Sequence, residues 1–262
     1  MASPIKSIEI LEPHPASEAV HPDRLDTGPY QPPSPKAPSL HITAYAYGDL
    51  KSAVLGSYVD LANTISESKR YASLRTIRED ALISRSRCRA TQFFLLDDKD
   101  VWLQLDHDIQ FETKDLYAIA DIAHQRQAVV CIPYSCRALP PKPAHRPKPD
   151  AKPLDDDPRL TPILFMASGA VAIPKQALTQ ALQILEQDVT PHPYRIEWCQ
   201  DQMVGQFPTL WMPFVLGSDK GNEYLSEDYA ASARLALVDV PQLAYSPRTP
   251  LRHWGDLPFQ LP

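Results

Sequence analysis

The chain lacks several features that would place it among secreted, disulfide-stabilised or membrane proteins. It contains only 4 cysteines, and no two of them form a Cys-x-x-Cys pair, so we expect reduced thiols at Cys88, Cys131, Cys136 and Cys199. No apolar run is long enough to span a bilayer, and the first residues lack the basic-then-apolar pattern of a secretory signal. These absences predict a soluble, cytoplasmic protein without a membrane partner.

An excess of positive charge is also missing. The 262 residues include 26 Lys and Arg against 32 Asp and Glu, which gives a net charge of -6 and a pI near 5.7. This balance argues against a protein coated in positive charge for nonspecific nucleic-acid binding, although it is compatible with a local basic groove. A chain of this length can bury a substantial core, and we expect one domain of catalytic size.

Proline, in contrast, is abundant and marks the organisation of the chain. Residues 1–40 are crowded with proline and show little periodic apolar pattern, so we expect an N-terminal arm and not a domain. A second proline-rich tract, at about 137–162, predicts a long inserted loop within a single domain that spans 41–262. Such a loop is either functional or a tolerated surface insertion.

Between these tracts, strand-like and helix-like patterns alternate. Apolar runs predict strands at 41–47, 101–105, 128–134 and 163–173, the last broken by Ser168-Gly169. Helical spacing predicts helices at 50–61, 80–96, 113–122 and 177–185. The last third begins with an apolar run at 207–216, and then predicts a polar loop at 217–224, a helix from Ser226 and an extended segment at 243–251. The alternation predicts an α/β fold with a mainly parallel central sheet between two layers of helices, as in Rossmann-like proteins.

The most informative motif is the strand Val101–Leu105, which ends in Asp106-His107-Asp108. Two carboxylates at the carboxyl end of a strand place hard oxygen ligands at the rim of an α/β sheet, where a cation and the phosphates of a nucleotide can meet. The alternative interpretation is ordinary turn chemistry or solvated surface.

Two later segments add titratable groups. Ser226 caps a predicted helix whose first turn holds Glu227 and Asp228, either as functional carboxylates or as simple complements to the helix dipole. His253, near the chain end, suits a metal or mixed-ligand site, or else forms a structural hydrogen bond.

A run of arginines precedes the acidic motif. Its members could direct guanidinium groups at a diphosphate, or form the solvated face of a helix: Arg75, Arg78, Arg85, Arg87 and Arg89. Interpreted as one basic helix, this run predicts an anion-binding element.

Taken in order, these segments resemble the GT-A fold glycosyltransferases, in particular the compact enzymes of phages and bacteria. The resemblance covers residues 41–259 and rests on five short segments: Ser84-Arg85-Ser86-Arg87-Cys88, Leu105-Asp106-His107-Asp108-Ile109, Ser168-Gly169-Ala170, Ser226-Glu227-Asp228-Tyr229 and Leu251-Arg252-His253-Trp254-Gly255. It implies a GT-A-like mixed, mainly parallel sheet flanked by helices. Relatives commonly have Arg-Asn where this chain has Arg87-Cys88.

Carried over residue by residue, the resemblance implies a metal-dependent donor site. Asp108 and His253, with Asp106, would hold Mn²⁺ or Mg²⁺ at the donor diphosphate, and Asp106 would also approach the ribose. Asp228, or alternatively Glu227, would be the catalytic base. The implied donor contacts are Tyr45, Tyr47, Gly48, Arg85, Arg87, Asp106, Ser168 and Gly169.

The implied reaction is the transfer of a sugar, with inversion, from a nucleotide sugar to a hydroxyl group. A UDP-sugar is the expected donor. One candidate acceptor is a hydroxymethylated base in phage DNA, flipped into the pocket, with the stretch Lys69–Arg89 and the loop Lys142–Lys148 as phosphate contacts. A glycan or a small molecule is the alternative acceptor.

Two hypotheses from other classes stay open. A nucleotidyltransferase would use similar two-carboxylate metal chemistry, but Ala46-Tyr47-Gly48-Asp49 offers one glycine only and no glycine-rich phosphate loop. A non-catalytic binding module would use the proline tracts as ligands for partner domains. The sequence does not indicate an oligomeric state.

Overall fold

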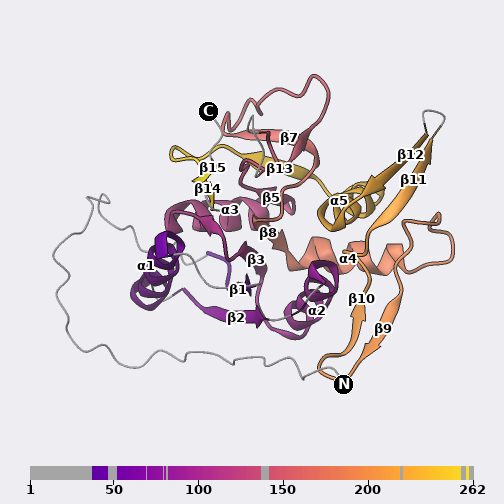
Figure 1. Cartoon of the computed structure of the whole chain (residues 1–262), viewed down its shortest axis with the longest axis horizontal. Coiled ribbons are helices and arrows are strands. Elements are labelled where there is room, and N and C mark those ends of the chain that lie inside the picture. Colours follow the sequence, from indigo (N-terminus) through magenta and orange to yellow (C-terminus); the bar gives the residue numbers. More distant parts are fainter. Residues whose placement is uncertain are drawn as a thin grey trace.

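The computed structural model describes residues 37–46, 52–68, 70–78, 80, 82–136, 142–218, 221–254 and 258–259. Most of the predicted arm, residues 1–36, therefore lies outside the described residues, as do Tyr47 and Gly48. The described residues build a large central sheet with helices around it and smaller sheets at its margins (Figure 1).

The central sheet has the strand order β2-β1-β3-β8-β5-β13-β7-β6. β8 and β7 pair antiparallel with both of their neighbours, whereas the other neighbouring strands pair in parallel. The sheet is therefore mixed, with β8 and β7 running against the direction of the rest. Its strands are β1 (Leu40–Ala46), β2 (Ala72–Arg78), β3 (Val101–Asp106), β5 (Val129–Cys131), β6 (Arg146–Pro147), β7 (Leu160–Phe165), β8 (Ala170–Pro174) and β13 (Gln242–Tyr245).

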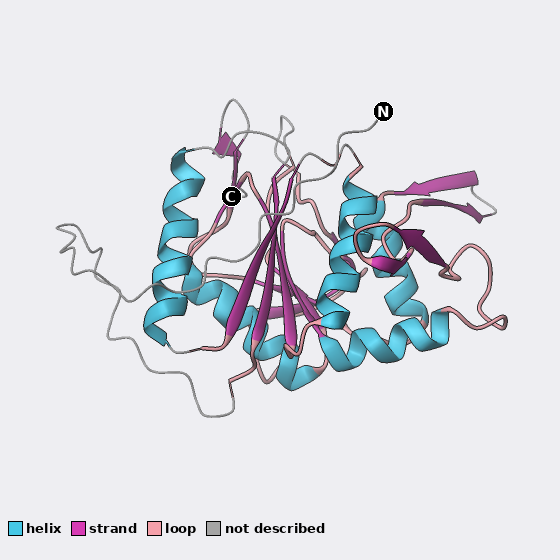
Figure 2. Ribbon diagram, turned by 90° about the horizontal axis from the view of Figure 1, so that it is seen from below, coloured by secondary structure: helices cyan, strands magenta, loops and turns pink. Residues whose placement is uncertain are grey.

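Helices lie on both sides of this sheet, as Figure 2 shows. α1 (Ser52–Ser68) contacts α3 (Thr113–Arg126), while α2 (Ile83–Leu96) contacts α4 (Lys175–Leu185), and α5 (Glu227–Leu237) packs on β7. The predicted α/β fold is confirmed: a mixed central sheet lies between layers of helices in a Rossmann-like arrangement. Within the described part of the chain, no helix has the length and apolar character needed to cross a membrane.

The core follows the apolar patterns of the sequence. Residues Val101–Leu105 of β3 are all buried, as expected for a strand covered on both faces. The Trp102 ring packs between Phe94 and Trp211, with ring centroids 5.7 and 6.2 Å away. α4 buries the predicted apolar stripe Ala177, Leu178, Ala181, Leu182 and Leu185. All four cysteines are free thiols, as predicted.

The predicted basic helix is wrong in its first part. Arg75 and Arg78 lie on β2, which pairs in parallel with β1 at the edge of the sheet, and α2 begins only at Ile83. β2 is half-exposed along most of its length, so it lacks the continuous apolar run that marks the central strands. The arginines therefore belong to two different elements.

The predicted polar loop at 217–224 is also wrong for most of its length. β11 (Phe214–Ser218) and β12 (Gly221–Leu225) form an antiparallel hairpin in which Val215 pairs with Tyr224. Gly221 has a φ of 116°, a conformation that L side chains rarely adopt. The hairpin projects from the body beside α5 (Figure 1), and four of the five residues of β12 are exposed. A second hairpin joins β9 (Trp198–Asp201) to β10 (Gly205–Pro208).

Candidate active site

A small sheet brings the end of the chain to the acidic motif. β14 (Arg252–Trp254) pairs with both β4 (Ile109–Gln110) and β15 (Pro258–Phe259), and His253 is in register with Ile109. The backbone N–H of Trp254 donates to the carbonyl of Asp108 at 2.7 Å. As a result, Nε2 of His253 lies 3.4 Å from Oδ2 of Asp108. Two residues expected to share a metal ion are therefore neighbours.

The second ring nitrogen of His253 defines the state of this pair. Nδ1 lies 2.9 Å from the carbonyl oxygen of Ser135, which can only accept a hydrogen bond, so Nδ1 carries a proton. In the neutral ring Nε2 is then an acceptor that faces a carboxylate oxygen. A donated N–H from the other nitrogen is the arrangement that orients a metal-binding histidine.

Asp106 has a different partner. Its carboxylate accepts hydrogen bonds from Nη2 of Arg87 at 2.9 and 3.2 Å. The Arg87 side chain is 1% exposed and that of Asp106 is 21% exposed, so the pair is largely shielded from water. Burial raises the pKa of Asp106, the Arg87 guanidinium lowers it, and the charge of Asp108 raises it. The acidic motif thus divides: Arg87 holds Asp106, and His253 faces Asp108.

Arg87 is fixed by groups from several strands. Its guanidinium carbon lies 4.7 Å from the centre of the Tyr45 ring and 5.5 Å from that of Trp211. Nη1 donates to Oε1 of Gln104 at 3.1 Å, and the Tyr45 hydroxyl donates to the same oxygen at 2.8 Å. The Arg87 and Tyr45 side chains, expected to contact the donor, are therefore buried and engaged with protein groups.

The neighbouring arginines of α2 form a separate network. Arg85 makes an ion pair with the buried Asp80 at 2.5 Å. Arg89 binds Asp80 as well and also pairs with Asp201 of β9. This network ties α2 to the β9–β10 hairpin, so the expected donor contact of Arg85 falls on a side chain that already has a partner.

A pocket of about 460 Å³ opens beside the Asp108–His253 pair. Its lining includes Asp228 and Ser226 from the start of α5, as well as Asp108 and His253. The remaining lining residues are Tyr134, Cys136, Ala144 and Tyr229. The tertiary structure therefore brings three of the predicted site residues, Asp108, His253 and Asp228, to one concave surface, whereas Asp106 is not among the residues that line it.

The two carboxylates at the start of α5 have different surroundings. Oδ1 of Asp228 accepts a hydrogen bond from the Ser226 hydroxyl at 2.5 Å and another from the backbone N–H of Tyr229 at 2.9 Å. Burial raises the pKa of Glu227, Arg87 lowers it, and the charges of Asp228 and Asp106 raise it. Glu227 is thus within the field of the Arg87–Asp106 pair, whereas Asp228 lines the pocket.

Ser168 and Gly169 contribute backbone groups. The Gly169 carbonyl accepts the backbone N–H of Asp106 at 2.9 Å, and the Ser168 carbonyl accepts a hydrogen bond from Arg87 at 3.4 Å. Both residues therefore support the Arg87–Asp106 pair directly. Any contact of theirs with a sugar stays a prediction.

Sequence reasoning missed Tyr134, which lines the pocket. Burial raises the pKa of Tyr134, and the nearby charges of Asp106, Asp228 and Asp108 raise it further, so its hydroxyl stays protonated among these carboxylates. The only available signal was its place at the end of the predicted strand 128–134. A tyrosine at the end of an apolar run is equally typical of the hydrophobic core, so this position did not specifically indicate a site residue.

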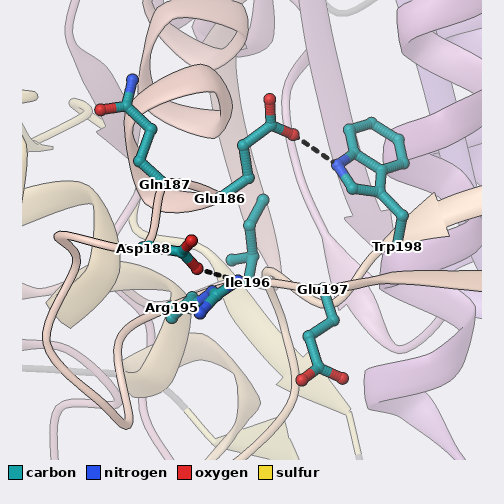
Figure 3. A pocket seen from close by; sticks show the side chains of 7 residues that line it. All are labelled: Glu186, Gln187, Asp188, Arg195, Ile196, Glu197 and Trp198. Carbon is teal, nitrogen blue, oxygen red and sulfur yellow. Dashed lines mark hydrogen bonds and ion pairs between the residues drawn. The ribbon is translucent and has the colours of Figure 1, made fainter.

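A second pocket, of about 610 Å³, lies where α4 ends and the chain returns to β9 (Figure 3). Its polar side chains bind one another: the Trp198 indole donates to Glu186 at 2.7 Å, and Arg195 pairs with Asp188 at 2.6 Å. None of the predicted site residues lines it.

The residues present fit a divalent cation that also has ligands from the substrate. Asp108 and His253 offer one oxygen and one nitrogen that lie 3.4 Å apart. In the described ranges no group of three His, Cys, Asp or Glu side chains could hold a metal ion unaided. Mg²⁺ is typically bound by one or two carboxylates together with water and substrate phosphates, so a two-ligand protein site suits a diphosphate donor.

The sequence matches no family model, and no curated protein matches it significantly. Among solved structures, the chain is similar to A197 from STIV, with a TM-score of 0.46 and 13% identity over 83% of this chain and 86% of that one. A glycosyltransferase involved in the glycosylation of the major capsid of PBCV-1 has a TM-score of 0.33 and 10% identity over 60% of this chain and 69% of that one.

A 4-diphosphocytidyl-2C-methyl-D-erythritol synthase from Anaerococcus prevotii is similar too, with a TM-score of 0.31 and 12% identity over 60% of this chain and 81% of that one. At these TM-scores the similarities do not bear on function.

Proposed function

We propose that the protein is a metal-dependent glycosyltransferase that moves a sugar from a nucleotide sugar to a hydroxyl acceptor. The observation that carries this proposal is the placement of Asp108 and His253 as facing acceptor atoms in the wall of a pocket that also holds Asp228. While the imidazole is neutral, these two acceptors at 3.4 Å repel each other, and either a proton on Nε2 or a bound cation makes the contact favourable. A cation that also binds a diphosphate is the second of these.

Each residue has a separate role in this proposal. Asp108 and His253 hold the cation. Arg87, which is buried, binds the Asp106 carboxylate and orients it toward the donor. A bound Mn²⁺ or Mg²⁺ would neutralise the charge that develops on the departing diphosphate. Arg87 acts as a positioning residue because its guanidinium is enclosed by protein groups and is directed at Asp106.

Asp228 is the proposed base. Its carboxylate takes the proton of the acceptor hydroxyl as that oxygen forms a bond to the anomeric carbon of the sugar. The bond between the anomeric carbon and the diphosphate oxygen breaks in the same step, and the electron pair leaves with the nucleotide. A single displacement of this kind inverts the anomeric centre. The bond from the Ser226 hydroxyl to Oδ1 fixes the orientation of the Asp228 carboxylate.

A UDP-sugar is the proposed donor, and a hydroxymethylated base in DNA is the first acceptor to test. Ala144 lines the pocket, and the exposed residues Lys142 and Lys148 lie near it in the chain and suit contacts with phosphates, whereas Arg146, in β6, is paired with Glu223. A glycan or a small molecule is the alternative acceptor.

The direct test is a thermal-shift screen of nucleotide sugars with and without Mn²⁺, because a ligand that binds the folded state raises the melting temperature. We expect that one nucleotide sugar stabilises the protein only when the metal is present. We also expect that the protein slowly releases UDP from this donor. Pyrophosphate release from a nucleoside triphosphate would instead identify a nucleotidyltransferase. No stabilisation by any nucleotide, with the same result for Asp108→Ala, would support a binding module.

A further inference from the structure

Tyr134 is in contact with the residue that completes the proposed metal site. Its ring centroid lies 5.2 Å from that of His253, and the two rings meet at 83° in an edge-to-face arrangement. This geometry is a favoured one for aromatic rings. The next residue, Ser135, provides the carbonyl that accepts a hydrogen bond from Nδ1–H of His253. Two consecutive residues thus hold the imidazole, one by its ring and one by its backbone.

Gly169 leaves the space that the Tyr134 ring occupies. A Cβ at position 169 would lie 2.7 Å from Cε1 and 3.0 Å from Cζ of Tyr134. It would also lie 3.0 Å from Cγ1 of Ile109, the residue of β4 that is in register with His253. Because Tyr134 is 9% exposed and Ile109 is fully buried, neither can move aside freely.

Both contacts act on His253. A side chain at position 169 would displace the Tyr134 ring, which packs on His253, and would press on Ile109, which is in register with His253. The backbone of Gly169 has no φ in the left-handed region that would by itself require glycine. Close approach of the Tyr134 ring is therefore the reason for a glycine at this position.

We propose that Gly169 and Tyr134 are a positioning pair that aligns the His253 imidazole, so that Nε2 faces Asp108. The proposal rests on the proposed function for the identity of the ligand, but the alignment itself is a property of the unliganded protein. It predicts that a single methyl group at position 169, whose nearest neighbours are Tyr134 and Ile109, weakens metal-supported nucleotide binding.

The test is a double-mutant cycle on the full chain, with Mn²⁺ and UDP as the probe and isothermal calorimetry as the measurement. Because outer-shell partners of metal ligands typically contribute 10- to 100-fold in affinity, we expect Gly169→Ala to weaken Mn²⁺-supported UDP binding by about tenfold. In a Tyr134→Ala background the same change should cost clearly less, because the ring it displaces is gone and only the 3.0 Å contact with Ile109 remains. Tyr134→Phe should bind nearly as well as the wild type, since the ring is kept.

Gly56→Ala is the matched control, because a Cβ at position 56 of α1 meets no atom within 4 Å. It should leave UDP binding unchanged. Equal losses from Gly169→Ala in the two backgrounds would overturn the proposal, as would wild-type binding by Gly169→Ala.

A second readout separates this proposal from the proposed function. The His253 ring signals, assigned by NMR with His253→Ala, should shift in Gly169→Ala without any ligand, and the shift should shrink in the Tyr134→Ala background. If the wild type binds no Mn²⁺–UDP, the proposed function fails, and these signals alone decide the positioning role. Unchanged signals in Gly169→Ala would then overturn it.

Discussion

Nε2 of His253 lies 3.4 Å from Oδ2 of Asp108, although Nδ1 of the same ring is committed as a donor to the Ser135 carbonyl. When the His253 ring is neutral, the two facing atoms are both acceptors, and either a proton on Nε2 or a bound cation makes the contact favourable. This relationship underlies the proposed cation site, and it leads to the first prediction.

His253→Ala and Asp108→Asn should each weaken Mn²⁺-supported UDP binding at least about tenfold, because each removes a direct metal ligand and not only an outer-shell partner. Calorimetric titration with UDP at fixed Mn²⁺ measures the effect. His124→Ala, in the last turn of α3, is the control and should bind UDP as the wild type does. Unchanged Mn²⁺ dependence in His253→Ala would return this histidine to a structural role.

Arg87→Met should lower the free energy of unfolding by about 3 kcal/mol, because it leaves the shielded Asp106 carboxylate without its partner. Adding Asp106→Asn should recover part of this loss, since the unpaired charge is then removed. Urea unfolding measures both values. As a control, Arg126→Met breaks only the exposed pair with Asp156 and should cost less than about 1 kcal/mol. Additive effects of the two changes at positions 87 and 106 would contradict this account.

Asp228→Asn should lower the rate of UDP release from the donor about 10²- to 10⁴-fold while UDP binding stays close to that of the wild type, because only the proton acceptor is lost. Glu227→Gln is the comparison: Glu227 responds to the Arg87–Asp106 pair, so its loss should affect donor binding more than the Asp228 change does. Parallel losses of binding and rate in Asp228→Asn would assign Asp228 to the donor site or to the fold.

The contribution of His41 to protein stability should fall as the pH is lowered from 7 to 5. This histidine is 2% exposed, and Nδ1 lies 2.6 Å from Oδ2 of Asp97. Burial lowers its pKa below 6.5, against the opposite effect of Asp97, with Arg75 and Lys99 lowering it further. At this position the unfolded chain therefore binds more protons as the pH falls through 6.5, and the contribution of His41 to the free energy of unfolding decreases there.

The His41→Gln variant isolates this contribution. Burial raises the pKa of Asp97, but its hydrogen bonds with His41, Ser73 and Lys99 hold it well below 3.8, so Asp97 stays ionised across this window in both states. The buried carboxylates with a raised pKa are common to both proteins and cancel in the comparison. Urea unfolding at several pH values should give a shallower slope for His41→Gln, by at most about 1.4 kcal/mol per pH unit. Identical slopes would exclude His41 as a contributor.

The parts of the fold predicted from sequence are those in which burial is continuous or regularly periodic. β3 and α4 were recognised because their apolar residues are buried in the same pattern that the sequence displays. β2 and β12 were missed because they are half-exposed or exposed, so backbone pairing and not an apolar pattern defines them, whereas β11 begins within the apolar run at 207–216. Tyr134 was not predicted as a site residue, because a tyrosine at the end of an apolar strand is typical of the hydrophobic core.

Local pattern was sufficient to predict an α/β protein with two carboxylates at the end of a buried strand. It could not assign their partners, because Arg87 reaches Asp106 from a different element, and His253 reaches Asp108 only through the pairing of β14 with β4. Contacts between residues so far apart in the chain depend on strand order and helix packing, which leave no periodic trace in the sequence. The sequence therefore specified the chemical groups, and the tertiary structure decided that Asp106 is held by an arginine while Asp108 faces a histidine.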